Sequence, residues 1–371
     1  MKRQRLYIVI FLALIIIVAG CTMVFQKNGM PSEEPAGADT GNTPGDDVAE
    51  DGNDNNGDNP ADSEKDIDLA DIKPNEAGKI MILMYHVIGE KEGEWSRTWE
   101  NFKKDLGVLY EKGYRLISLN DYLDNNIKVE AGYTPVVITF DDATQGQFNI
   151  LEEDGKLTVD PTSAVGILEE FYDKHPDFGL EATFYIYYPV PFRKKELIEY
   201  KLNYIVEKGM DIGNHTYGHA NLGTLDAEGI QQQLGRMVLE TQKIIPGYNI
   251  SSLALPYGAN AKEQFRSYVY SGSYQGVSYE NKGVLLVGSN PALSPIDRKF
   301  DPHKIPRIRA TEDPNINTDM YDWMDYFDKN PQERYVSDGD ETVISVPKSM
   351  EDRIDAERLG DKRLRVYELD Q

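Results

Sequence analysis

From Lys79 onward, short apolar runs alternate with amphipathic stretches, and this alternation restricts the fold more than any other feature of the chain. Residues 80–86 and 135–140 have the length and β-branched content of buried strands, and residues 98–113 between them have helical spacing. Strands that alternate with helices form a parallel sheet or barrel. The sequence therefore predicts an α/β fold.

The same alternation continues to about Thr311, with further predicted helices and strands. Predicted helices are 160–174, 194–208 and 226–245, and predicted strands are 181–188, 211–213, 251–255 and 284–287. Beyond Thr311 the pattern degrades, apart from an amphipathic patch at 320–327. We expect the short apolar runs 343–346 and 364–367 to pair as a small sheet in a C-terminal extension, residues 311–371.

The first 21 residues read as a targeting segment. Basic residues precede an apolar run at 6–19, and the only cysteine, Cys21, ends a sequence that resembles the processing box of bacterial lipoproteins. The alternative is an uncleaved signal anchor, because the run extended to Phe25 approaches the ~20 residues that span a bilayer. In both cases we expect an extracytoplasmic protein that is anchored to the cell membrane, in the first case by a lipid on Cys21.

Residues 22–78 are predicted to be an acidic, disordered linker. The chain has a formal net charge of −24, about half of it from residues 31–73, which are rich in Asp, Asn, Gly and Pro. Such a segment cannot bury enough apolar surface to offset its chain entropy. So acidic a protein is a poor partner for nucleic acid, which we exclude.

Two sequence elements place metal-binding side chains at the ends of predicted segments. His215 and His219 are four residues apart, which brings both imidazoles to one side of a helical turn and suits a single divalent metal. Asp141 and Asp142 directly follow the apolar strand 135–140. One carboxylate can complete a site with the histidines while the other acts as a base; the alternative is that the aspartates cap a helix.

A third element, residues 255–258, is a Pro-aromatic-Gly turn after another short strand. Its Tyr257 can turn a backbone N–H toward the site, as an oxyanion hole requires, although alone it is a common loop.

Together, in this order and spacing, the three elements resemble the polysaccharide deacetylase family, also called the NodB-homology group or carbohydrate esterase family four. The resemblance covers residues 79–310, the predicted catalytic domain. It implies a deformed (β/α) barrel and a divalent metal, with zinc as first choice. It also implies roles for five residues: Asp141 as catalytic base, Asp142, His215 and His219 as metal ligands, and the Tyr257 N–H as an oxyanion donor.

Two parts of the family pattern are missing. Ala254 stands where many members have an arginine that orients the base, and no Leu-x-His supplies a general acid near the end of the domain. Arg307 could replace the arginine from another strand and pair with Asp141, although a solvated arginine is equally plausible.

For the acid, residues 84–86 look like the first strand of the branch that deacetylates poly-N-acetylglucosamine. His86 is therefore our first choice of proton donor, the alternative being a core histidine bonded to a backbone carbonyl. His303, in a polar loop, ranks second.

The expected activity is hydrolytic removal of N-acetyl groups from a cell-surface or matrix polysaccharide, a hydrolase reaction on a carbon–nitrogen bond other than a peptide bond. Two alternatives stay open: an esterase that removes O-acetyl groups from a glycan, and a glycan-binding protein that kept the fold and lost catalysis.

Overall fold

A computed structural model describes residues 68–313, 315 and 318–368. The chain divides into two compact units, and the described residues all belong to the second, Ser63–Gln371. The predicted signal peptide, the lipidated Cys21 and most of the predicted linker lie outside the described residues. None of the helices in the described part is long and apolar enough to cross a membrane.

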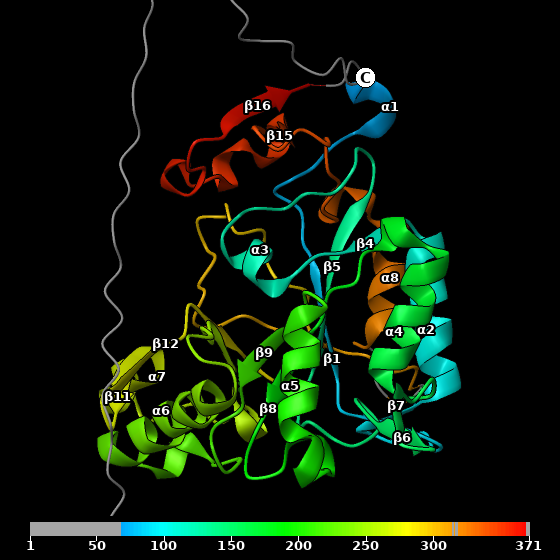
Figure 1. The fold of residues 1–371 in the computed structure, drawn as a ribbon. Helices are drawn as coiled ribbons and strands as arrows, with labels where there is room; N and C mark the ends of the chain where they lie inside the picture. The colour runs from blue at the N-terminus through cyan, green and yellow to red at the C-terminus, as the bar shows by residue number, and fades with distance from the viewer. Residues whose placement is uncertain (1–67, 314, 316–317, 369–371) are drawn as a thin grey trace, which may run out of the picture. The chain divides into compact units, whose positions relative to one another are not determined.

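An entirely parallel sheet organises this unit (Figure 1). Its strands pair in the order β13-β10-β9-β8-β5-β1-β14, and β4 pairs with the first half of β5. The strands are β1 (Met81–Tyr85), β4 (Tyr114–Leu116), β5 (Thr134–Phe140), β8 (Thr183–Ile186), β9 (Asp211–Asn214), β10 (Ser252–Ala254), β13 (Gly283–Leu285) and β14 (Ile308–Arg309).

The sheet curls until one short segment touches both of its edges. Ile305 forms a parallel bridge with Leu285 of β13, and three residues later Ile308 pairs with Leu83 of β1. Residues 305–309 thus connect the two edge strands and nearly close the sheet into a barrel. The predicted deformed (β/α) barrel is confirmed.

Successive side chains of each strand point to opposite faces, which produces two apolar layers. Ile82, Val137 and Tyr185 face the barrel interior together with Leu285 and Ile305. Their neighbours along the strands, such as Leu83 and Phe184, pack under the helices. Each such side chain contributes about 1.5–3 kcal/mol when it is fully buried, so both layers hold the strands in register.

Four long helices cover the outer layer: α2 (Trp99–Glu111), α4 (Ala164–Lys174), α5 (Ile198–Glu207) and α6 (Ala227–Ile244). Helices α2 and α4 lie side by side (Figure 1). Helices α2, α4 and α6 begin at side-chain caps, from Thr98, Ser163 and Asp226 respectively. Each cap satisfies backbone N–H groups of the first turn. Shorter helices are α1 (Leu69–Ile72), α3 (Leu119–Leu123) and α7 (Ser267–Tyr270).

Three two-stranded ribbons extend from the loops of the barrel. They are β2 (Val87–Gly89) with β3 (Ser96–Thr98), β6 (Ile150–Glu153) with β7 (Lys156–Val159), and β11 (Ser271–Tyr274) with β12 (Val277–Glu280). The first ribbon is parallel and the other two are antiparallel hairpins.

The C-terminal part contains α8 (Met320–Lys329), β15 (Val343–Pro347) and β16 (Arg363–Tyr367). The predicted pairing of 343–346 with 364–367 is present, as a parallel pair. This part also holds residues assigned to the linker: Asn75 pairs with Val336, and Glu76 is buried. The predicted domain boundaries themselves stay predictions.

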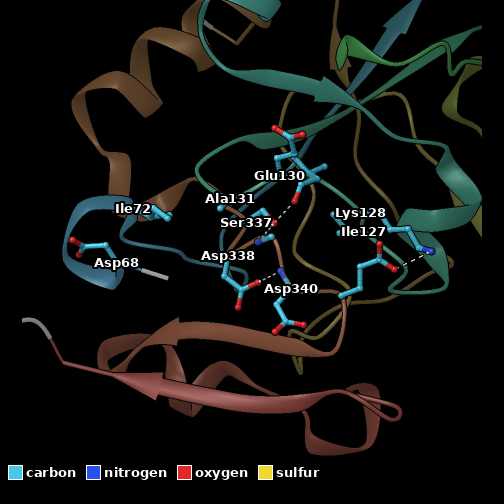
Figure 2. Close-up of a pocket in the computed structure, with 12 residues that line it drawn as sticks. Asp68, Ile72, Ile127, Lys128, Glu130, Ala131, Ser337, Asp338 and Asp340 are labelled. Carbon is cyan, nitrogen blue, oxygen red and sulfur yellow. Dashed lines mark hydrogen bonds and ion pairs between the residues drawn. The ribbon is translucent and has the colours of Figure 1, made fainter. Parts of the chain in front are cut away.

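A cavity of 660 Å³ lies at the end of the barrel where β5 begins, lined by residues 127–131 and 337–341 together with Asp68 and Ile72. Figure 2 shows the acidic side chains of Asp68, Glu130, Asp338 and Asp340 around it. Its one lysine, Lys128, pairs with Glu341 at 3.0 Å. The predicted site residues lie at the other end of β5, so this cavity is separate from them.

Candidate metal and catalytic site

Asp142, His215 and His219 converge beyond the carboxyl ends of the strands. Each offers one ligand atom, and these atoms all lie within 4.8 Å of one another. The Asp142 carboxylate is 3.5 Å from His215 Nε2 and 3.2 Å from His219 Nε2. Burial acts to raise the pKa of Asp142, but the two histidines outweigh it and hold the pKa below its ordinary value.

Both imidazoles have a hydrogen-bond partner at Nδ1, on the side away from Asp142. His215 Nδ1 is 2.8 Å from the carbonyl oxygen of Ala254, so Nδ1 carries the proton and donates it there. His219 Nδ1 is 3.0 Å from the hydroxyl of Tyr257. With both Nδ1 atoms engaged, the two Nε2 atoms face Asp142. Two imidazole nitrogens and one carboxylate oxygen are a donor set of catalytic zinc sites, which keep a further position open, so these residues fit a divalent metal.

The backbone around the site is strained. Five of the eleven non-glycine residues with positive φ in the described part belong to its three loops: Asp142, Ala143, Thr216, His219 and Tyr257. Such conformations cost on the order of 1–3 kcal/mol each and concentrate at functional sites. The prediction that a helical turn joins His215 to His219 was wrong, because the chain makes a tight turn there, with φ 59° at Thr216. Ala220 N–H donates to the Thr216 hydroxyl at 2.7 Å and fixes this turn.

Asp141 lies beside this cluster, inside the barrel, and meets Arg307. The guanidinium donates from Nη1 and Nη2 to the two carboxylate oxygens, both at 2.7 Å. Arg307 also donates to the carbonyl of Leu286 and to the hydroxyl of Thr139. Burial pushes the pKa of Asp141 up, but Arg307 more than offsets it and the pKa is lowered. The carboxylate is therefore ionised and held in one orientation.

His86 follows β1 and places Nε2 3.9 Å from the Asp141 carboxylate. Burial lowers the pKa of His86, while Asp141 and Asp142 act in the opposite direction. The backbone of His86 is tied to that of Asp141 by Gln147, whose side-chain amide donates to both carbonyl oxygens.

The structure thus brings together Asp141, Asp142, His86, His215, His219, Tyr257 and Arg307, whose roles stay predictions. His303 is elsewhere: its ring stacks on Tyr270 at 3.8 Å. The backbone N–H of Tyr257 donates to no acceptor within the described part of the chain, and the residue stands at φ 60°.

Sequence reasoning missed three contacts at the site: the Tyr257 hydroxyl on His219, the Gln147 bridge, and Trp95 against His86, whose ring centroids are 4.7 Å apart. Trp95 was recognisable as an aromatic residue in a loop after the first strand, whereas no pattern in the sequence marks Gln147.

Residues 128–275 match the family model of the polysaccharide deacetylases. This part of the chain is therefore similar to the polysaccharide deacetylases. The matched region includes Asp141, Asp142, His215, His219 and Tyr257, while His86 and Arg307 lie outside it.

Solved deacetylase structures are similar to the chain at low identity. The Streptococcus pyogenes deacetylase PplD, in complex with acetate, is 18% identical with a TM-score of 0.49, covering 67% of this chain and 97% of that one. IcaB from Ammonifex degensii is 16% identical with a TM-score of 0.42, covering 67% and 97%. A Bacillus cereus polysaccharide deacetylase is 18% identical with a TM-score of 0.44, and the match spans 62% of this chain and 64% of that protein's length. A search of curated proteins finds no match.

Proposed function

We propose that the chain removes N-acetyl groups from a cell-surface or matrix polysaccharide, with zinc as the divalent ion, and that it acts outside the cytoplasm as a membrane-anchored lipoprotein. The observation that carries the proposal is the Asp141 carboxylate, fixed by Arg307 beside the Asp142, His215 and His219 cluster. An ionised base next to three ligand atoms is what hydrolysis of an amide by an activated water requires.

Asp142, His215 and His219 would hold the ion, which when bound supplies a Lewis acid that polarises the acetyl carbonyl and acidifies water. Asp141 accepts the proton of the attacking water, and Arg307 keeps that carboxylate in place. The free N–H of Tyr257 stabilises the oxyanion. His86, 3.9 Å from Asp141, donates the proton that the leaving amine needs when the C–N bond breaks.

The test is acetate release by the full-length chain from N-acetylglucosamine oligomers, with and without added zinc. Asp141→Asn and His86→Ala should each lower the rate by at least about a hundredfold, the scale of general acid–base catalysis. His303→Ala is the matched control for His86→Ala, because His303 stacks on Tyr270 away from the site.

The two alternatives give different results in the same assay. Release from acetylated xylan but not from the oligomers would identify an O-acetyl esterase. Zinc binding without release from either substrate would indicate a glycan-binding protein and refute the proposal.

A further inference from the structure

The three histidines around the site are oriented in different ways. His215 and His219 each have a hydrogen bond at Nδ1, to Ala254 and to Tyr257. Within the described part of the chain, no hydrogen bond reaches the ring of His86, and the Asp141 carboxylate at 3.9 Å is beyond hydrogen-bond distance. The orientation of the His86 ring must therefore come from packing.

Trp95 supplies that packing. The indole and the imidazole of His86 have centroids 4.7 Å apart and planes inclined by 56°. The guanidinium of Arg309 lies over the same indole, 4.7 Å from its centroid, and Glu94 lies 3.7 Å from Arg309. An indole face that a guanidinium covers is not free to stack on a sugar, so Trp95 is better placed to act on His86 than on a substrate.

The backbone that carries Trp95 is fixed at the residue itself and just after it. At Trp95, the Val87 N–H donates to the carbonyl oxygen at 3.0 Å. Two residues later, Arg97 of β3 donates two hydrogen bonds to Asp105 of α2, at 2.9 and 2.5 Å, and both side chains are buried. A buried, bidentate pair of this kind resists displacement, so the indole has a firm support.

We propose that Trp95 is a positioning residue for His86 and holds its Nε2 beside Asp141, where it can reach the leaving amine. The inference rests on the proposed deacetylase function and adds Trp95 to it, as a residue that acts only through His86. A displacement of about 1 Å in a reacting group can cost a hundredfold in rate, so loss of the indole should slow turnover without changing how substrate or metal binds.

The kinetic arm uses the full-length chain, zinc and N-acetylglucosamine oligomers. Trp95→Ala should lower kcat by about tenfold to a hundredfold, with KM and zinc affinity unchanged, and Trp95→Phe should recover most of the loss. In a His86→Ala background, Trp95→Ala should not lower kcat any further. Tyr326→Ala is the control, because Tyr326 and Trp95 are equally exposed, at 38%. A raised KM with kcat unchanged, or a full further loss in the His86→Ala background, would overturn the proposal.

The second arm needs no activity and uses histidine ring NMR signals of the metal-free chain. Trp95→Ala should shift the His86 ring signals, because the ring current of the indole disappears, while those of His303 should stay unchanged. Unaltered His86 signals would overturn the proposal. If the wild-type chain released no acetate, the proposed function would fail, while this arm would still show whether Trp95 packs against His86.

Discussion

Arg307 binds the carboxylate of Asp141 through two parallel hydrogen bonds, both 2.7 Å long, and neither side chain is exposed to solvent by more than 2%. The planar guanidinium matches the geometry of the carboxylate, so the contact fixes the direction of the carboxylate as well as its charge. Removing one member leaves the other charge buried without a partner.

Arg307→Met should therefore destabilise the fold by about 3–5 kcal/mol, the usual cost of an uncompensated buried charge. Arg307→Lys should recover only part of the lost stability, because an ammonium group cannot donate two parallel hydrogen bonds to the carboxylate. Urea unfolding measures the free energy of unfolding of both variants. The control is Lys243→Met, since the pair of Lys243 with Glu240 is solvent-exposed and is worth at most about 1 kcal/mol. Equal stability of the Arg307 and Lys243 variants would contradict the prediction.

Tyr257→Phe should weaken zinc binding by about tenfold or more, because outer partners of ligating histidines typically contribute that much. The lost hydroxyl is the one 3.0 Å from His219 Nδ1. Isothermal titration of the metal-free chain with zinc gives the affinity. Tyr187→Phe is a close control: the Tyr187 ring also lies near His219, but its hydroxyl accepts a hydrogen bond from Arg193. Similar zinc affinities for the two variants would show that the hydroxyl on His219 does not matter.

Glu76 should make the fold less stable as the pH rises. Burial, with a further contribution from Asp338, raises the pKa of Glu76 from 4.5 to about 8. Between these values the folded chain keeps a proton that the unfolded chain releases, so stability is complete below about pH 4.5, falls up to about pH 8 and then levels off. The total loss is on the order of a few kcal/mol.

Denaturant unfolding across this pH range measures the slope, and Glu76→Gln should flatten it. Glu130→Gln, at an exposed position, should leave the slope in place. A wild-type stability that rises steadily from pH 5 to pH 8, with no change in slope on Glu76→Gln, would rule out this role for Glu76.

Gly146→Ala should disturb the ribbon that carries Trp95. A Cβ at Gly146 would overlap the carbonyl oxygen of Ile88, a backbone atom that cannot move aside without disturbing the ribbon. We expect a loss of about 1–3 kcal/mol, as for other overpacked sites, together with slower turnover. Gly107→Ala is the control, because a Cβ there meets nothing within 4 Å; in the middle of α2 it should stabilise the helix by about 0.5–1 kcal/mol. Normal thermal stability of the Gly146 variant would contradict the close approach.

The strands and long helices could be predicted from the sequence because each is encoded locally. The run 135–140 is apolar at every position except Thr139, and it forms most of β5. Residues 226–245 have helical spacing of apolar residues, and they form α6. The same holds for the Asp141 and Asp142 pair, since a side chain after a parallel strand must lie at the carboxyl edge of the sheet.

What could not be predicted depends on contacts between distant segments or on unusual backbone angles. Strand β14 has two residues, too few for any periodicity. The sequence could therefore offer the pairing of Arg307 with Asp141 only beside the alternative of a solvated arginine, and it is the curl of the sheet that brings the two together. The positive φ of Thr216 is one that β-branched residues rarely adopt, so spacing alone suggested a helical turn. From the sequence, Glu76 was assigned to the polar linker. The fold instead buries it, and Tyr335 and Ser345, which are far away in the sequence, donate hydrogen bonds to its carboxylate.

The segment 305–309 that joins the two edges of the sheet also links closure of the barrel to the charge environment of Asp141. Strands β1 to β13 all precede it in the chain, so the aspartates and histidines of the site can gather before Arg307 arrives. Until then the Asp141 carboxylate has no guanidinium and the barrel has an open seam. Contacts between distant parts of a chain form late because their loop-closure entropy must be overcome first. The same segment thus closes the seam and supplies the partner of Asp141, so activity of the proposed deacetylase would report that the barrel has closed.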